Sequence, residues 1–502
     1  MKTTRIRLAA PLLLLLALLI SGCAGTMRSY DSELNQTVGK ASSGQVAQAL
    51  VELEKNNSDS DKDLLYFMEK GELLKLNAQI PESRDAWLSA DEKVKIWEDE
   101  AKNSPEKLIG NIGSVIINDK TRRYDGQDYE KVMLSTRLAL DHVLLGNWDQ
   151  ARTEIKKTHE REGIIADLRA KEMDKVESES RERNVKTEVK DVKGYPVETL
   201  NDPEVTALKN SYQSAFSHYL AGFVYEALNE PSLAAPGYRK AIELRPDVKF
   251  LEEGLSGLDT RAGKRKRNET DVLFVVESGS IPARQSVSLP IPARISGSWI
   301  AIPISFPVIR PDKTVFLPAE ISIDGRSTRI HPVTNLDAMA RRALKDDMPG
   351  IILRGTIRAI AKSAAQKAAS DKHGLLGLAV AIAAVVTESA DERGWRTLPA
   401  QILVGRTFLP AGRHTVSISG PFGTRTESVE VAGKYAVVPL RLMGSSLYLS
   451  QPYLSLELIA ASVANSAAEL TAAPAHEEEA AKPAVKKKTV KKNKSTTQGV
   501  QP

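Results

Sequence analysis

The sequence of 502 residues contains a single cysteine, Cys23, and only 5% aromatic residues. One cysteine excludes intrachain disulfides, and it excludes the zinc and iron–sulfur sites that need several cysteines. The sequence also lacks H-E-x-x-H, G-x-S-x-G and G-x-x-x-x-G-K-[ST], which mark zinc proteases, serine hydrolases and phosphate-binding loops. We therefore expect no enzyme, no cofactor and no metal site.

Seven histidines are scattered along the chain. His331 and His414 could meet a serine and an aspartate, which leaves a cell-wall hydrolase or transferase as the weakest alternative. Most lone histidines are structural or exposed.

Long apolar runs are confined to the N-terminus and to residues 374–386, and the composition is 42% hydrophobic and 26% charged. That balance excludes a polytopic membrane protein and a wholly disordered chain. A chain of this length predicts two or more domains.

The net charge of +5 comes from the two ends of the chain. Lys2, Arg5 and Arg7 lie at the start, and seven lysines without any acid lie between residues 480 and 502. The body between these ends is net acidic. The export signal described next also makes an encounter with nucleic acid rare. We expect no nucleic-acid partner.

The N-terminus has the pattern of an export signal. Cationic residues precede the apolar run 12–20, which is too short to span a bilayer comfortably. The string Ile20-Ser21-Gly22-Cys23 resembles the lipobox of bacterial lipoproteins, and an ordinary export signal is the alternative. The resemblance implies a signal peptide over 1–22, acyl chains including palmitate on Cys23, a tether over 23–43 and, from Ala24, sorting to the outer membrane.

Residues 44–258 are predicted to form an α-helical tetratricopeptide-like solenoid. One 34-residue copy, over 215–248, carries small residues for close helix approach, aromatic residues between helices and a proline after the second helix. Two more copies are degenerate, and three are about the minimum for a stable stack. The predicted packing residues are Phe67, Gly71, Trp87 and Ala90; Leu138, Gly146, Trp148 and Ala151; and Gly222, Tyr225, Ala234, Tyr238, Ala241 and Pro246.

The groove between such repeats binds peptides or partner helices, so we expect protein partners through the repeat domain. The charge-rich stretch after Trp148 predicts a helix longer than a standard repeat. It is either a solvated helix or a coiled-coil arm for a partner.

A linker over 259–270 precedes a β-rich domain over 271–458. Alternating segments, an Asp324-Gly325 turn and frequent prolines predict an antiparallel β-sandwich-like domain. The fold class is thus multidomain α + β, with a helical insertion over 335–391. Within it, 374–386 is either a buried helix or a membrane-inserting or self-association surface.

Residues 124–130, 138–151, 390–399 and 409–415 resemble those of a family of uncharacterised bacterial tetratricopeptide-repeat outer-membrane lipoproteins. The resemblance implies repeats in front, a β-rich module behind and a link to cell-envelope assembly, because members are encoded near a lipoprotein activator of peptidoglycan synthases. Asp391, Arg393, Trp395 and Arg396 form either a recognition site for an anionic partner or a clasp between the insertion and the next strand, through an Arg–Trp stack and an ion pair.

Residues 465–502 are predicted to be a disordered, lysine-rich tail that either contacts peptidoglycan or anionic lipid or only solubilises the protein. We expect an outer-membrane-anchored periplasmic scaffold linked to peptidoglycan synthesis. The alternative is a membrane-active or self-assembling component of an envelope or secretion complex.

Replacing Cys23 by Ala removes the predicted acylation site, so the variant should leave the membrane fraction for the soluble periplasmic fraction. Immunoblotting of sedimented membranes measures this. Continued co-sedimentation of the Cys23→Ala variant would contradict the lipid anchor.

Overall fold

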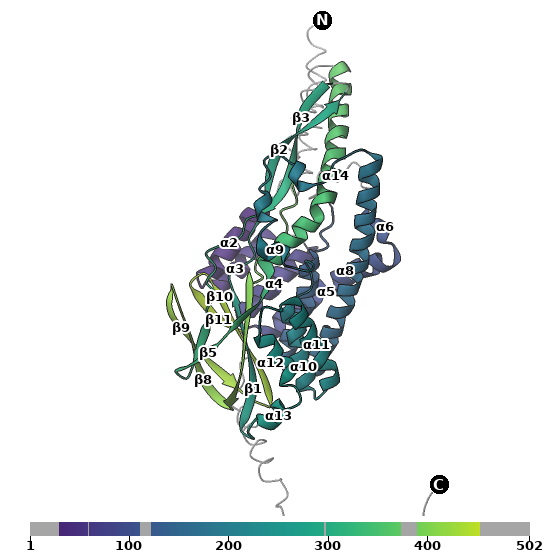
Figure 1. Ribbon diagram of the computed structural model, residues 1–502. Helices are drawn as coiled ribbons and strands as arrows, with labels where there is room; N and C mark the ends of the chain where they lie inside the picture. Colours follow the sequence, from purple (N-terminus) through teal and green to yellow (C-terminus); the bar gives the residue numbers. More distant parts are fainter. Residues whose placement is uncertain (1–29, 59, 111–121, 296–297, 373–388, 452–502) are drawn as a thin grey trace, which may run out of the picture.

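The computed structural model describes residues 30–58, 60–110, 122–295, 298–372 and 389–451. Its N-terminal region is helical and its C-terminal region is rich in strands, so the chain has a mixed α and β fold (Figure 1). Cys23, the segment 374–386 and the tail 465–502 lie outside the described residues.

The helical region is built mainly from antiparallel hairpins, in which α4 packs on α5, α7 on α8 and α10 on α11. Its helices are α2 (Tyr30–Ser42), α3 (Val46–Asn56), α4 (Leu64–Leu76), α5 (Ile80–Asn103), α6 (Pro105–Ile109), α7 (Asp128–Leu144), α8 (Trp148–Glu182), α9 (Pro203–Thr206), α10 (Ala215–Ala227), α11 (Pro231–Leu244), α12 (Phe250–Ser256) and α13 (Arg261–Lys264), with 3-10 turns η2 (Val189–Asp191) and η3 (Val197–Thr199).

Helices α4 and α5 of the first of these hairpins pack closely at Gly71. A Cβ added there would lie 2.2 Å from Nε1 of Trp87, so only glycine allows the two helices to approach this closely. Trp87 donates from Nε1 to the Met68 carbonyl at 3.1 Å, and Ser83 donates to the Gly71 carbonyl at 2.8 Å. The indole is therefore held by both packing and a hydrogen bond.

The same spacing recurs along the chain. A Cβ at Gly222 would lie 2.7 Å from the ring of Tyr238, which follows Gly222 by 16 residues, as Trp87 follows Gly71. In the middle hairpin, buried Ala139 and Ile155 stand at these two positions. Gly146 is exposed with φ +76°, and a Cβ there meets nothing within 4 Å, so it makes the α7–α8 turn instead of packing between helices.

The strands form three sheets, with orders β11-β10-β1-β7-β6, β5-β4-β8-β9 and β2-β3. Their bounds are β1 (Glu269–Ser278), β2 (Arg284–Ile295), β3 (Ser298–Ile309), β4 (Glu320–Ile323), β5 (Arg326–Arg329), β6 (His331–Asn335), β7 (Gln401–Pro410), β8 (Gly412–Gly420), β9 (Gly423–Val431), β10 (Tyr435–Met443) and β11 (Ser446–Leu449). β1 pairs in parallel with β10, so the five-stranded sheet is mixed and the prediction of a purely antiparallel arrangement is wrong. A parallel pair needs a long crossover connection, and the chain between β1 and β10 supplies it.

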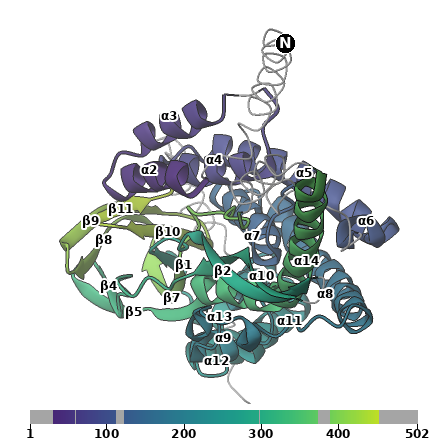
Figure 2. The same cartoon turned by 90° about the horizontal axis from the view of Figure 1, so that it is seen from above.

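Strand β1 separates two hydrophobic cores. Leu273 and Val275 belong to the large core shared with the helices, whereas Val272, Phe274 and Val276 belong to the core between the two larger sheets. Alternate side chains of a strand point to opposite faces, and both faces here are covered. The layers are therefore helices, five-stranded sheet and four-stranded sheet, with the helices arranged along one side of the strands (Figure 2).

The β2–β3 hairpin and α14 (Leu336–Lys372) extend together beyond these layers (Figure 1). They pack through apolar side chains: a Cβ at Gly355 of α14 would lie 2.8 Å from Ile304 of β3. Of the helices in the described ranges, none is both long and apolar enough to cross a membrane.

The region predicted as a linker, 259–270, is folded. Residues 261–264 form α13, and β1 starts at Glu269. Arg261 binds Glu226 of α10 at 2.8 Å and the carbonyls of Glu253 and Gly254, so α13 is anchored to the helical region. Because the large core also draws residues from both regions, the two regions share one interior.

Replacing Gly71 by Ala should lower the free energy of unfolding by roughly 1–3 kcal/mol, because the added methyl group overpacks against Trp87. Gly163→Ala is the matched control: Gly163 is an exposed helical glycine of α8 with nothing within 4 Å, so alanine should stabilise the helix by about 0.5–1 kcal/mol. Denaturant unfolding measures both. Equal effects of the two substitutions would contradict the close approach of α4 and α5.

Candidate functional site

The predicted partner groove is covered by the chain's own C-terminal region. Helices α4, α7 and α10, the first helix of each hairpin, are buried along nearly their whole length. α7 contacts β10 and α14, and α10 contacts β6. In the described part of the chain, the inner face of the hairpins therefore packs on the sheet.

The segment after the helical insertion ties the two regions together. Arg393 pairs with Asp391 at 2.8 Å, lies over the Tyr124 ring at 5.1 Å and donates to the Arg122 carbonyl. Trp395 is fully buried edge-to-face against Trp87, at 6.1 Å between ring centroids. The expected ion pair is present, but the ring beneath Arg393 is Tyr124, and the segment holds the helical region, not only the next strand.

Two buried glutamates of the helices accept hydrogen bonds from the backbone of this segment. Glu130 accepts the backbone N–H of Trp395 at 2.8 Å, and Glu69 accepts those of Arg396 and Thr397 at 2.6 and 3.1 Å. Burial raises the pKa of Glu69 to about 7, against the lowering effect of the hydrogen bonds from Thr397 and Arg396. Each carboxylate thus acts as the missing hydrogen-bond partner of a stretch without secondary structure.

A buried ionic cluster lies between α4, α7 and the five-stranded sheet. Arg137 binds Glu277 of β1 and Glu72 of α4, and Arg441 of β10 donates to the Thr397 carbonyl at 2.9 Å. Burial opposes the charge of Glu277, but Arg137 prevails and lowers the pKa of that carboxyl. Burial lowers the pKa of Arg441 to about 10. This cluster makes the interface between the two regions polar at its centre.

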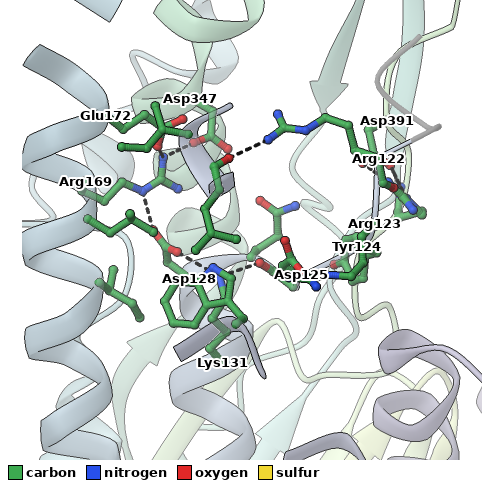
Figure 3. A pocket seen from close by; sticks show the side chains of 18 of the residues that line it. Arg122, Arg123, Tyr124, Asp125, Asp128, Lys131, Arg169, Glu172, Asp347 and Asp391 are labelled. Carbon is green, nitrogen blue, oxygen red and sulfur yellow. Dashed lines mark hydrogen bonds and ion pairs between the residues drawn. The ribbon is translucent and has the colours of Figure 1, made fainter. Parts of the chain in front are cut away.

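A recess of about 200 Å³, partly open to solvent, lies between the 122–131 segment, α8 and α14 (Figure 3). It is the candidate binding site of the protein, because charged side chains from distant parts of the sequence converge on it. The charged lining residues are Arg122, Arg123, Lys131, Arg169, Arg284, Arg354 and Arg393, together with Asp125, Asp128, Glu172, Asp347 and Asp391.

Arg169 organises one wall of the recess. It extends from α8 between Asp128 of α7 and Asp347 of α14, and Asp128 also binds Lys131 at 3.2 Å (Figure 3). Burial opposes ionisation of Asp128, but Arg169 and Lys131 lower the pKa of its carboxyl. Three helices are thereby fixed around the opening by ion pairs.

Arg284, the first residue of β2, differs from Arg169 in having no carboxylate partner among the described residues. Its side chain lines the recess and is buried, with the residue 6% exposed. Its Nε has no hydrogen-bond partner, and no carboxylate within the described ranges forms an ion pair with it. A guanidinium cannot lose its proton in a protein, so its charge stays uncompensated at short range.

Most of the predicted repeat residues lie inside the helical core. Trp87, Ala90, Leu138, Ala151, Tyr225, Ala234, Tyr238 and Ala241 are buried, and Phe67 and Trp148 pack against the core from its edge. Pro246 is exposed just after the end of α11. These positions pack the helices of the hairpins against one another.

No group of three or more His, Cys, Asp or Glu residues in the described part of the chain is placed to hold a metal ion. His414 binds Asp324 through Nδ1 at 2.6 Å and the Pro410 carbonyl through Nε2 at 2.8 Å. Both ring nitrogens are therefore engaged: Nδ1 links β8 to the β4–β5 turn, and Nε2 links β8 to the end of β7.

Sequence reasoning missed Glu69, Glu130, Arg137, Glu277 and Arg284. A charged residue after an apolar run, such as Glu277 after VLFVV, is the signal that could have pointed to a buried charge. Arg284 carries no such signal, since it begins a strand in a polar, proline-rich context.

Glu69 should give the protein a measurable pH dependence. Its pKa is raised in the folded state, so its contribution to stability is fully present below the unfolded value near 4.5 and is lost as the pH rises through about 7. The loss amounts to about 3 kcal/mol. The difference between the free energies of unfolding at pH 5 and pH 8 should be smaller in Glu69→Gln than in the wild type. The exposed Glu82→Gln control should keep the wild-type difference, and an unchanged difference in Glu69→Gln would contradict the assignment.

No protein-family model matches the chain, and no curated protein matches it. Among solved structures, a tetratricopeptide repeat protein from Parabacteroides merdae aligns with 46% of this chain and 99% of its own, at 14% identity and a TM-score of 0.13. So low a TM-score does not establish a shared fold. The family resemblance stays a prediction from the residues quoted above.

Proposed function

We propose that the protein is a scaffold of the bacterial cell envelope that positions partner proteins without covalent chemistry. In this proposal, Cys23 carries the lipid that anchors it in the outer membrane, and the body faces the periplasm. The observation that carries the scaffold role is the recurring helix contact, glycine against a large aromatic side chain 16 residues later in two hairpins, with buried Ala139 and Ile155 at the same spacing in the third. Such repetition is typical of tetratricopeptide-like repeats, which bind proteins.

The partner surface in this proposal lies on the outer helices, because the inner face is occupied by the sheet. Helix α5 buries one side against α4 and α7 and leaves Leu88 37% and Ile96 54% exposed. Large apolar side chains on an otherwise charged helix suit a contact with another protein. We take the exposed side of α5 as the first candidate surface.

The ion pairs between the two regions support a positioning role. Arg406 of β7 binds Glu226 of α10 at 3.0 Å, and Arg341 of α14 binds Asp202 before α9 at 2.8 Å. A body cross-linked in this way holds a bound partner at a defined orientation to the anchor. The proposed link to peptidoglycan synthesis and the contact of the 465–502 tail with peptidoglycan or anionic lipid rest on the sequence alone.

A second candidate is self-assembly or membrane contact through the projecting arm of β2, β3 and α14. The observation that favours it is Ile360, a large apolar side chain that is 44% exposed on α14. The apolar residues 374–386 follow this helix in the sequence.

Photo-crosslinking in intact cells tests the scaffold. A photoreactive amino acid at Leu88 or Ile96 should give one discrete adduct with a partner protein, and this adduct should weaken in the Cys23→Ala background. The matched control position is Thr424, which is exposed on β9 of the four-stranded sheet. Adducts of equal yield at all three positions, or none on α5, would contradict the proposed surface. Concentration-dependent self-adducts at Ile360 would instead support the second candidate.

A further inference from the structure

In the recess beside α8, every acidic side chain of the lining is paired, but cationic side chains are in excess. All five acidic side chains of its lining already have a cationic partner. Arg169 binds Asp128, Glu172 and Asp347, Arg123 binds Asp125, and Arg393 binds Asp391. The lining contains seven cationic side chains against these five acids, so its balance is positive.

The uncompensated charge is located at Arg284. Burial of an unpaired guanidinium costs several kcal/mol, so proteins normally pair such a group. Glu130 lies on the other side of Gly394: a Cβ added at Gly394 would lie 3.5 Å from Glu130 Oε1 and 3.8 Å from Arg284 Cδ. Glu130 forms no ion pair with Arg284 and already accepts four hydrogen bonds, from Tyr124, Gln127, Tyr129 and Trp395.

We propose that this recess binds the oxyanion of a small molecule, a carboxylate or a phosphate group, with Arg284 as the counter-ion. A guanidinium presents parallel N–H donors that match such groups in a bidentate manner. The volume of about 200 Å³ exceeds the ~150 Å³ of a cavity that holds benzene, so a small organic anion fits. The proposal does not depend on the scaffold role or on the lipid anchor.

The site also connects parts of the fold that are distant in sequence. Arg284 begins β2, Lys131 lies on α7, Arg354 lies on α14, and Arg393 lies in the segment that ties the two regions together. A bound oxyanion would thus contact the helices, the projecting arm and the tying segment at once. Binding should therefore stabilise the whole body against unfolding, because a ligand bound to the folded state alone adds to its stability.

Thermal unfolding of the full-length protein tests this with two probes, inorganic phosphate and succinate, at an ionic strength held constant with sodium chloride. The wild type should show a melting temperature that rises with the concentration of one or both probes. A response to phosphate only, or to succinate only, identifies which oxyanion the recess takes. Isothermal titration calorimetry with the same probe gives the affinity directly.

Variants at Arg284 separate the site from general ion effects. Arg284→Gln should abolish the response, and Arg284→Lys, which keeps the charge but loses the paired donors, should weaken binding roughly 10- to 100-fold. Arg310→Gln is the matched control on the same hairpin, since Arg310 is exposed and binds Gln285 at 2.6 Å. It should respond like the wild type.

Two results would overturn the proposal: no response of the wild type to either probe, as expected if the recess holds only water, or an equal response in Arg284→Gln. If Arg284→Gln does not fold, the calorimetric comparison of the wild type with Arg284→Lys decides. Equal affinities of these two proteins would then also overturn it.

Discussion

The ion pairs around Arg137 are the interaction on which the remaining structure depends. Arg137 is fully buried at the middle of α7 and reaches Glu72 in the preceding hairpin and Glu277 in the central strand. Removing one partner of such a cluster leaves an unpaired buried charge, at a cost of about 3–5 kcal/mol. The register between the helices and the sheet is therefore specified more narrowly than apolar contacts alone would require. Lys75 and Asp141, 3.2 Å apart on α4 and α7, extend the same cluster.

This polar interface explains why the inner face of the hairpins is closed. Arg137 on the inner helix α7 meets Glu277 on the chain's own strand β1. Glu69 and Glu130 likewise bind the backbone of the 390–397 segment. The C-terminal region thus covers the inner face of the hairpins, and the surfaces that we propose for contacts with other molecules are the outer helices, the arm and the recess.

The recess follows from the same architecture. Three helices and a strand meet at one end of the interface, and Arg169 holds two of them by ion pairs to Asp128 and Asp347. The lining of the recess holds seven cationic side chains and five acidic ones, so the charges do not balance. Arg284 is the charge that this part of the chain leaves unpaired.

Local patterns in the sequence were enough to predict the helical and strand-rich regions, the long helix after Trp148 and the turn at Asp324 and Gly325, because these features depend on periodicity and turn chemistry within a few residues. Helix α7 was harder to interpret, since burial on all sides removes the contrast between faces that an amphipathic pattern needs. The mixed pairing of β1, the covered groove and the ion pairs between Arg137 and Glu277 were decided only by the tertiary structure, since they join residues more than a hundred positions apart. The lipid anchor proposed at Cys23, the one cysteine, is also a local prediction, because it rests on the three residues before it.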